Sequence, residues 1–366
     1  MEYGCPMSNV AYSALKAAWH TDKIDKMRLG EQIVPVGVQL ILSDFCNHDC
    51  HFCAYRASNG LSVEQFKGPD KSGAISHNPL RMMTEDKASE IINDCSGLGV
   101  KSITFTGGGE PTVHPQHLEM FALAMDLGMD ASLNTNGNIL RKGWQDVIPR
   151  MKYARFSIDA GTAEEYAQIR GVPETTYEKV LGNLRLVASE CDETVVGTGY
   201  VVTPENWVNL DTGVRRIKET GATYVRLASM QSTEQNAAYP EDTWAKASEA
   251  CQQAVSDHAD DNFSVVNLFD GVMGVQPSDP FCGFQQFVTY LGADLKVYRC
   301  CYTAYTGLGE IGDLREQSYA EWFYSQQKKD AIGCFDARSC AICPLEPKNK
   351  TINYMLDGDP MHVNFV

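Results

Sequence analysis

Length, composition and charge already narrow the class of protein. The chain has 366 residues, 43% of them hydrophobic, which is enough for a large core and a smaller unit beside it. Its formal net charge is −16, and an acidic surface repels phosphate backbones and anionic lipids. We therefore expect no nucleic acid and no membrane among its partners.

The 13 cysteines indicate the compartment. Their odd number and the length of the chain do not fit a secreted disulfide scaffold. The first residues lack the basic start and apolar run of a secretion signal, and no apolar stretch approaches the ~20 residues of a membrane helix. The expected location is cytoplasmic, where a reducing environment leaves thiols available for metals.

Residues 1–34 are predicted to form a helical or irregular lead-in. After them, short β-rich runs alternate with stretches of helical spacing. A helix is expected over 84–98, where apolar residues recur three or four positions apart and Gly99 follows as a cap. The predicted strands are 36–42, 102–106, 131–135, 154–159, 195–202 and 223–228.

Alternating strands and helices predict an α/β fold with a parallel sheet and the helices outside it. Six units are too few to close a standard eight-fold barrel. We therefore expect a partial (β/α)6 TIM-like barrel, with its site at the carboxyl ends of the strands. The region 57–82 has no clear periodicity, which predicts either a lid over that site or an ordinary surface insertion.

The pattern changes beyond residue 240. A helix over about 241–259 leads into short strands, turns and the remaining cysteines. The expected parts of the chain are a lead-in (1–34), the barrel (35–240), a linking helix and connection (241–270), and a small C-terminal α+β domain (271–366).

Three cysteines, Cys46, Cys50 and Cys53, lie in one short loop directly after the first predicted strand. Thiolates are soft ligands that hold iron–sulfur clusters, and three of them can converge on one centre. Three ligands on a four-iron cluster leave one iron open for chemistry. A zinc site with His48 or His51 is the alternative, although structural zinc usually takes CxxC pairs.

These cysteines have CxxxCxxC spacing, with Phe52 one place before the last. A glycine run and an acidic residue end the second strand, and a Ser-Ile-Asp segment ends the fourth. Over roughly residues 36–230, this combination resembles the signature of the radical S-adenosylmethionine (SAM) enzymes. The resemblance implies a [4Fe–4S] cluster with bound SAM, which an electron donor such as flavodoxin or ferredoxin reduces. SAM then yields a 5′-deoxyadenosyl radical that abstracts hydrogen from the substrate.

The same resemblance implies roles for individual residues. Gly107, Gly108 and Gly109 would let the backbone approach the methionine moiety, and Glu110 would accept a hydrogen bond from its ammonium group. Ser157 and Asp159 lie where ribose or substrate contacts occur, with Asp159 as the catalytic candidate. Asn136 is a lining candidate, and Arg170 would meet the SAM carboxylate. The alternatives are a turn or helix cap for Asp159 and a surface salt bridge for Arg170.

A second cysteine set follows in the C-terminal part. Cys282 and Cys300 flank a predicted β-hairpin with the turn Gly292-Ala293-Asp294, and Cys340 and Cys343 form a CxxC. This resembles the twitch domain, the shorter form of the SPASM extension, and implies one auxiliary [4Fe–4S] cluster held by Cys282, Cys300, Cys340 and Cys343.

Several alternatives stay open for this second set. A zinc ribbon has the same pattern of hairpin and CxxC. Cys301 and Cys334 are either replacements for an assigned ligand or small buried hydrophobes. One departure from the resemblance is Leu295, which stands where the hairpin usually has glycine.

The functional prediction is a radical SAM enzyme that oxidises, epimerises or cyclises a small metabolite or natural-product intermediate. Four protein thiolates would leave the auxiliary cluster no open iron, so it would relay electrons. The second hypothesis is a maturase of a ribosomally made peptide. The third is a non-catalytic iron–sulfur or zinc protein.

Overall fold

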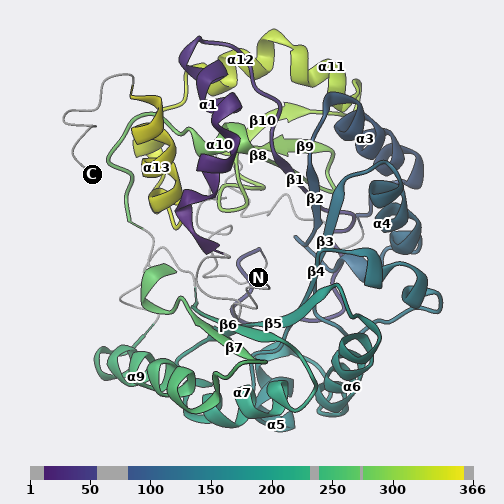
Figure 1. The fold of residues 1–366 in the computed structure, drawn as a ribbon, viewed down its shortest axis with the longest axis vertical. Helices are drawn as coiled ribbons and strands as arrows, with labels where there is room; N and C mark the ends of the chain where they lie inside the picture. Colours follow the sequence, from purple (N-terminus) through teal and green to yellow (C-terminus); the bar gives the residue numbers. More distant parts are fainter. Residues whose placement is uncertain (1–11, 56–80, 231–238, 273–274, 358–366) are drawn as a thin grey trace.

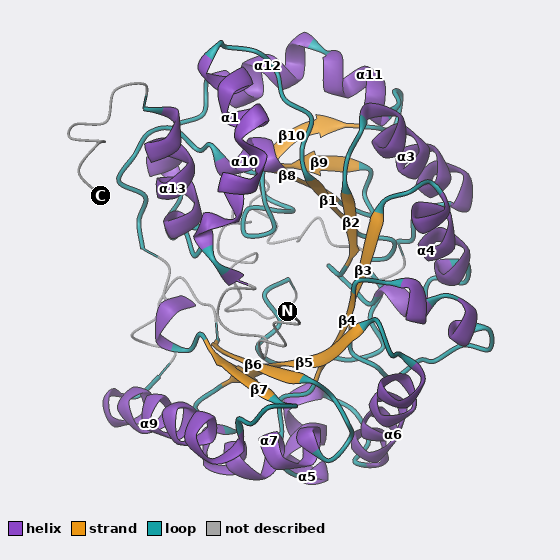
Figure 2. Cartoon of the chain, in the orientation of Figure 1, coloured by secondary structure: helices purple, strands orange, loops and turns teal. Residues whose placement is uncertain are grey.

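The fold is taken from a computed structural model that describes residues 12–55, 81–230, 239–272 and 275–357. Within these ranges one ten-stranded sheet has the order β10-β9-β8-β1-β2-β3-β4-β5-β6-β7. The sheet curves into an arc that helices cover on its outer face (Figures 1 and 2). The strands are β1 Gly37–Leu40, β2 Ser102–Phe105, β3 Asp130–Thr135, β4 Tyr153–Ser157, β5 Val195–Val202, β6 Tyr224–Ser229, β7 Ser264–Asn267, β8 Val288–Leu291, β9 Lys296–Tyr298 and β10 Glu310–Asp313.

Strands β1 to β6 are the six strands predicted from the sequence, and each pairs in parallel with the next. The partial barrel is therefore confirmed. Beyond the six predicted strands, β7 extends the parallel sheet at the β6 side, where it pairs with β6 after the long helix α9.

Helices connect the strands and pack outside them. The α-helices are α1 Thr21–Arg28, α3 Glu85–Leu98, α4 His117–Asp126, α5 Ala163–Arg170, α6 Thr175–Glu190, α7 Leu210–Lys218, α9 Glu241–His258, α10 Phe284–Phe287, α11 Tyr319–Tyr324, α12 Gln326–Gly333 and α13 Glu346–Leu356. The 3-10 helices are η2 Ala14–His20, η3 Pro111–Val113, η4 Trp144–Asp146, η5 Ile148–Arg150, η6 Trp207–Asn209, η7 Asp270–Val272 and η8 Ala337–Ser339.

Helix α3 shows how local sequence sets these elements. The Thr84 side chain accepts a hydrogen bond from the Lys87 N–H and so caps the first turn. Gly99 ends the helix with φ +91°, a left-handed conformation that glycine adopts without steric cost. Ile91 and Ile92 are buried against the sheet, as the helical spacing predicts.

Alternation along each strand separates the core from the barrel interior. In β4, Ala154 and Phe156 are buried in the main core beneath the helices, so Tyr153, Arg155 and Ser157 face inward. The inner surface of the barrel therefore carries the polar side chains of the strands.

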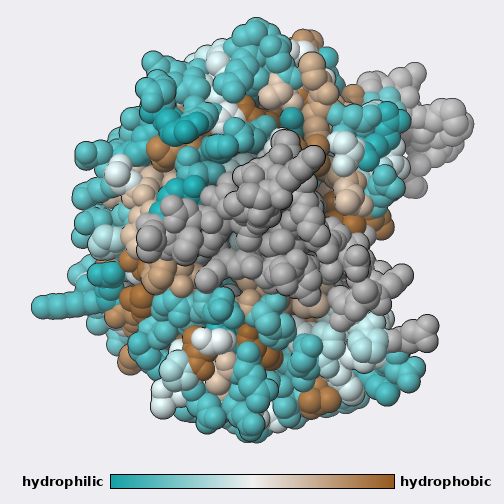
Figure 3. All heavy atoms as spheres, turned by 180° about the vertical axis from the view of Figure 1, so that it is seen from behind, coloured by the Kyte–Doolittle hydropathy of each residue, from teal (hydrophilic) through white to brown (hydrophobic). Residues whose placement is uncertain are grey.

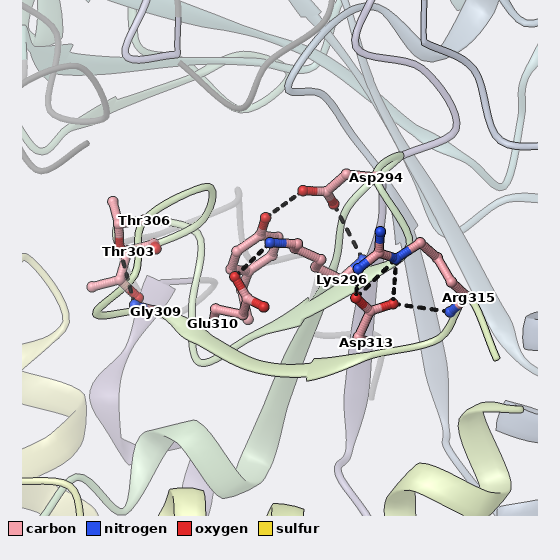
Figure 4. Close-up of polar contacts among 9 residues, drawn as sticks. Asp294, Lys296, Thr303, Thr306, Gly309, Glu310, Asp313 and Arg315 are labelled. Atoms are coloured by element: carbon pink, nitrogen blue, oxygen red, sulfur yellow. Dashed lines mark hydrogen bonds and ion pairs between the residues drawn. The ribbon is translucent and has the colours of Figure 1, made fainter. Parts of the chain in front are cut away.

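The C-terminal hairpin joins the same sheet. Strand β8 pairs in parallel with β1, while β8 and β9, and β9 and β10, pair antiparallel. Beyond the turn, Lys296 Nζ lies 2.6 Å from Glu310 Oε2 across the β9–β10 pair, and Arg315 pairs with Asp313 (Figure 4). The predicted hairpin is confirmed, but its partnership with β1 was not predicted.

The turn between β8 and β9 has Leu295 in place of the usual glycine. It takes φ +63°, in the left-handed region that costs a residue with a side chain about 1–2 kcal/mol. Its N–H donates to Gly292 O at 3.0 Å, and Leu314 N–H donates to Leu295 O at 2.7 Å. Both bonds help to hold the leucine in a conformation that glycine would adopt more easily.

The surface opposite to the view of Figure 1 is largely polar where described residues form it, with apolar patches between (Figure 3). No helix in the described ranges is long and apolar enough to cross a membrane. The region 57–82, predicted to be either a lid or a surface insertion, lies outside the described residues except for Arg81 and Met82.

Candidate functional site

A cavity of about 290 Å³ lies at the carboxyl ends of the strands. The structure brings every residue predicted for this site to its lining except Asp159. These lining residues are Cys46, Cys50, Phe52, Cys53, Gly107, Gly108, Gly109, Glu110, Asn136, Ser157 and Arg170.

The cysteine loop is clamped between the glycine run and the end of α5. Gly109 N–H donates to Ser43 O at 3.1 Å, and a Cβ on Gly109 would lie 2.2 Å from Phe45 O. On the other side, Asp49 N–H donates to Arg170 O at 2.8 Å. Gly171 packs against Asp49 with φ +61°, where a Cβ would lie 2.8 Å from Asp49 O. Glycine is needed at both contacts because the two backbones touch.

The sulfur atoms of the loop lie among donors suited to thiolates. None of the three thiols forms a disulfide. Arg170 Nη1 lies 3.4 Å from Cys50 Sγ, and Asn136 Nδ2 lies 3.8 Å from Cys46 Sγ. Burial, and next the charge of Glu110, raise the pKa of Cys46 to about 12. A soft cation would stabilise this thiolate, so the donor set fits an iron–sulfur cluster.

Glu110 ties the glycine run to the loop after β3. Its Oε1 accepts hydrogen bonds from Thr112 N, Thr112 Oγ1 and Thr135 Oγ1 at 3.0, 2.7 and 2.6 Å. Its Oε2 accepts from Asn136 N at 2.7 Å and keeps capacity for a further donor. Burial raises the pKa of this carboxyl, and the hydrogen bonds oppose that rise.

Asp159 lies behind the cavity wall and is only 1% exposed. Its carboxylate accepts from Arg170 Nη2 and from Val201 N, the latter at 2.6 Å. It caps no helix, because Thr162 caps α5. Arg170 is itself 5% exposed, so its ion pair is buried and not the surface salt bridge considered from the sequence. Asp159 therefore contacts the residue that reaches Cys50, and not the cavity.

Four tyrosines, three of them from the C-terminal hairpin region, support the site from below the cysteine loop. Tyr290 OH donates to Tyr55 OH at 3.2 Å, and Tyr305 OH donates to Asp44 Oδ1 at 2.6 Å. A Cβ on Gly108 would lie 2.6 Å from Tyr305 OH. With Tyr298, these rings form a buried cluster, which we call the tyrosine cluster. Sequence reasoning missed it, although Tyr55 stands two places after Cys53.

Other lining residues were also missed. Thr106, Asn134, Val201 and Ser229 line the cavity from β2, β3, β5 and β6 or their ends. The alternation of inward and outward positions along each strand was the signal that could have found Asn134 and Val201.

The second cysteine set also converges. Its four predicted ligands line a cavity of about 30 Å³ in the C-terminal part of the chain: Cys282, Cys300, Cys340 and Cys343. Cys301 and Cys334 are not in that lining, and Cys334 is exposed at the end of α12. Burial raises the pKa of Cys282 to about 11.

The surroundings of this second cavity are cationic and aromatic. Arg299 lines it, donates to Gln285 Oε1 at 2.6 Å, and lies 3.9 Å from the centre of the Phe335 ring. Burial lowers the pKa of Arg299, and the thiols of Cys282 and Cys340 oppose that shift.

Across the described residues, no group of three or more His, Cys, Asp or Glu side chains is arranged to hold a single metal ion.

The chain is similar to several curated proteins, and it spans less than half of the length of each of them. It is 26% identical to a probable GTP 3′,8-cyclase of Methanosarcina acetivorans over 146 residues, 40% of this chain and 39% of the relative. It is 27% identical to an AdoMet-dependent heme synthase of Methanosarcina barkeri over 122 residues, 32% of this chain and 34% of the relative. It is 31% identical to an S-adenosylmethionine-dependent nucleotide dehydratase of Flammeovirga pacifica over 119 residues, 32% and 36% of the two chains.

Solved structures resemble more of the fold. Streptococcus suis SuiB bound to its precursor peptide SuiA aligns with a TM-score of 0.61 at 13% identity, covering 90% of this chain and 74% of SuiB. The enzyme anSMEcpe with bound AdoMet aligns with a TM-score of 0.59 at 18% identity, covering 82% and 80%. At these identities the likeness concerns the fold alone.

The sequence profile of the Radical SAM superfamily matches residues 40–215, the stretch that holds the cysteine loop, the glycine run and Asp159. Members of this superfamily are enzymes that bind a [4Fe–4S] cluster and SAM. Residues 40–215, just under half of the chain, therefore carry a match to the Radical SAM superfamily, and they lie within the partial barrel described above.

Proposed function

We propose that the protein cleaves SAM reductively at Cys46, Cys50 and Cys53 and abstracts a hydrogen atom from a small metabolite or natural-product intermediate. The observation that carries the proposal is one cavity lined by the three cysteine side chains of the loop and by the Gly107–Gly109 run. When bound, the cluster and SAM supply a 5′-deoxyadenosyl radical. The electron donor is proposed to be a flavodoxin or ferredoxin.

The residues around the cavity have positioning tasks in this proposal. Arg170 holds the Cys50 side of the loop, and Asp159 orients Arg170 through the buried ion pair. Glu110 Oε2 accepts from Asn136 N and has spare acceptor capacity for the SAM ammonium group, while Oε1 accepts from Thr112 and from Thr135 at the end of β3. Ser157 lines the cavity and is proposed to contact the ribose of SAM or the substrate.

An auxiliary [4Fe–4S] cluster is proposed at Cys282, Cys300, Cys340 and Cys343. The support is their convergence on one cavity, from which Cys301 and Cys334 are absent. With four protein thiolates this cluster would have no open iron, so it would accept an electron from the substrate radical. That favours an oxidation or an oxidative ring closure, in which the substrate radical loses an electron.

Reduction of anaerobically reconstituted protein with dithionite in the presence of SAM tests the main proposal. The expected product is 5′-deoxyadenosine, and a protein with its full iron content that never forms it would overturn the proposal. Iron and sulfide analysis tests the auxiliary cluster. About eight irons per chain are expected for two four-iron clusters, against about four for one.

A peptide maturase is the second candidate. It is favoured by the fold-level match to SuiB, a structure with a bound precursor peptide, across 90% of this chain. The named activities of the cyclase and the nucleotide dehydratase favour a small molecule instead. Binding assays with short peptides encoded beside the gene, set against nucleotide binding, separate the two.

A further inference from the structure

The barrel interior continues from the thiol-lined cavity toward the amino ends of the strands. Ser157 lines that cavity, and Arg155 is the next inward residue below it on β4, about 7 Å along the strand. Arg226 occupies an inward position on β6, because its neighbours Val225 and Leu227 are buried in the outer core. Two arginines therefore line the barrel interior beneath the cavity.

Arg155 leans back toward that cavity. A Cβ built on Gly199 would lie 3.6 Å from Arg155 Cδ and 3.7 Å from its Nε. Gly199 pairs with Ser157 in the β4–β5 register, so it lies at the level of the cavity wall. The two distances from Gly199 are ordinary contact distances, so the Arg155 side chain extends alongside Gly199.

A second cavity of about 270 Å³ lies at the amino ends of β4, β5 and β6. Among the described residues, its lining consists of Val195 and of cationic and phenolic side chains: Tyr12, Lys16, Lys152, Tyr153, Arg155 and Tyr224. Arg155 thus connects this basic cavity with the level of the thiol-lined one. The Arg226 guanidinium lies 5.4 Å from the Tyr12 ring centre, at the edge of the same space.

Of the positive charges here, Lys152 lies 3.6 Å from Asp130 Oδ1, whereas the others lack carboxylate partners among the described residues. Arg155, Arg226 and Lys16 form no ion pair within the described part of the chain. Arg226 Nε is buried with no hydrogen-bond partner there. Burial, and then the charge of Arg155, lower the pKa of Arg226. Gathering uncompensated cations inside a protein of net charge −16 costs free energy, which a bound anion would offset.

We propose that the substrate of this enzyme carries a phosphate group, which Arg155 and Arg226 bind beneath the radical-forming cavity. A guanidinium matches a phosphate with two parallel hydrogen bonds, and the tyrosine hydroxyls add further donors. A phosphate brings nearly two negative charges, whereas one carboxylate would neutralise one cation. The inference rests on the proposed function, since it takes the reacting part of the substrate to lie at the Ser157 level.

Pyrophosphate is the probe for the test, with citrate as a carboxylate probe of comparable charge. Isothermal titration of the full chain should detect pyrophosphate binding that Arg155→Gln and Arg226→Gln each weaken at least about tenfold. Arg155→Lys should retain part of the affinity, because it keeps the charge but loses the fork of donors. Arg185→Gln, at an exposed position on α6, is the matched control and should bind as the wild type does.

Circular dichroism of each variant checks that it folds. Lys16→Gln changes an exposed residue that lines the same cavity, so this variant should fold even if the two arginine variants do not. Absence of pyrophosphate binding in the wild type, equal binding in all variants, or tighter binding of citrate would overturn the phosphate assignment. Formation of 5′-deoxyadenosine by the same wild-type preparation shows whether the proposed function stands when this inference fails.

Discussion

Gly109 is the residue whose lack of a side chain the site depends on most directly. It lies against the backbone of Asp44 and Phe45, where a Cβ would come within 2.2 Å of a carbonyl oxygen. The sequence resemblance assigns the glycine run to contact with SAM. The structure adds that Gly109 also holds the start of the cysteine loop, and that Gly108 makes room for Tyr305.

Gly109→Ala should displace the cysteine loop and lower the iron content of the reconstituted protein by half or more. The clash is with backbone, so relief requires the loop itself to move, at a cost of roughly 1–3 kcal/mol in stability. Iron per chain and the unfolding midpoint are the measurements. Gly97→Ala is the control, because an added Cβ there meets nothing within 4 Å on the exposed side of α3. Wild-type iron content in Gly109→Ala would contradict the clamping role.

Asp159→Asn should destabilise the protein by about 3–5 kcal/mol, since it leaves the charge of Arg170 buried without a partner. It should also weaken SAM binding, measured by titration, because Arg170 would no longer be held beside Cys50. A catalytic Asp159 would behave differently, with SAM affinity retained and only turnover of substrate lost. The double variant with Arg170→Gln should recover part of the lost stability, because it removes the unpaired charge.

Local signals predicted the elements better than the contacts between them. The helix at 84–98 with its Gly99 cap, the six strands and the hairpin after Cys282 all follow periodicity and turn residues in the chain. The pairing of β8 with β1 does not, because it joins segments about 250 residues apart through backbone bonds that any sequence can make. Asp159 was placed at the right strand end, but its burial depends on Arg170 and Val201, which only the folded chain brings to it.

The second cysteine set gives a prediction at the level of the hairpin and the segment that follows it. Cys340→Ala should reduce the iron content from about eight to about four per chain, since it removes one ligand of the proposed auxiliary cluster. Cys334→Ala should leave the content unchanged, because Cys334 is exposed and outside the cavity. Equal losses in both variants would mean that the ligand set is different from the one proposed.

At the scale of the whole molecule, cluster binding and folding should be thermodynamically linked. The second cysteine set draws its residues from segments far apart in the chain, because Cys282 and Cys343 are separated by strands β8, β9 and β10 and helices α10, α11 and α12. Ligands that bind the folded state alone raise its stability by mass action. The reconstituted protein should therefore unfold at a clearly higher temperature than the same chain stripped by a chelator, as anaerobic calorimetry would measure. Identical midpoints would argue against cluster binding by the folded chain.

Strand β8 sits directly beside β1, in register from Val38 opposite Thr289 to Leu40 opposite Leu291. The loop with Cys46, Cys50 and Cys53 follows β1, and the hairpin that ends at Cys300 begins with β8. Within the described residues, backbone hydrogen bonds between β1 and β8 and between β8 and β9 thus connect the strands on which the two proposed centres are built. Electrons moving from one to the other would tunnel across an unchanging gap, at a rate indifferent to solvent viscosity.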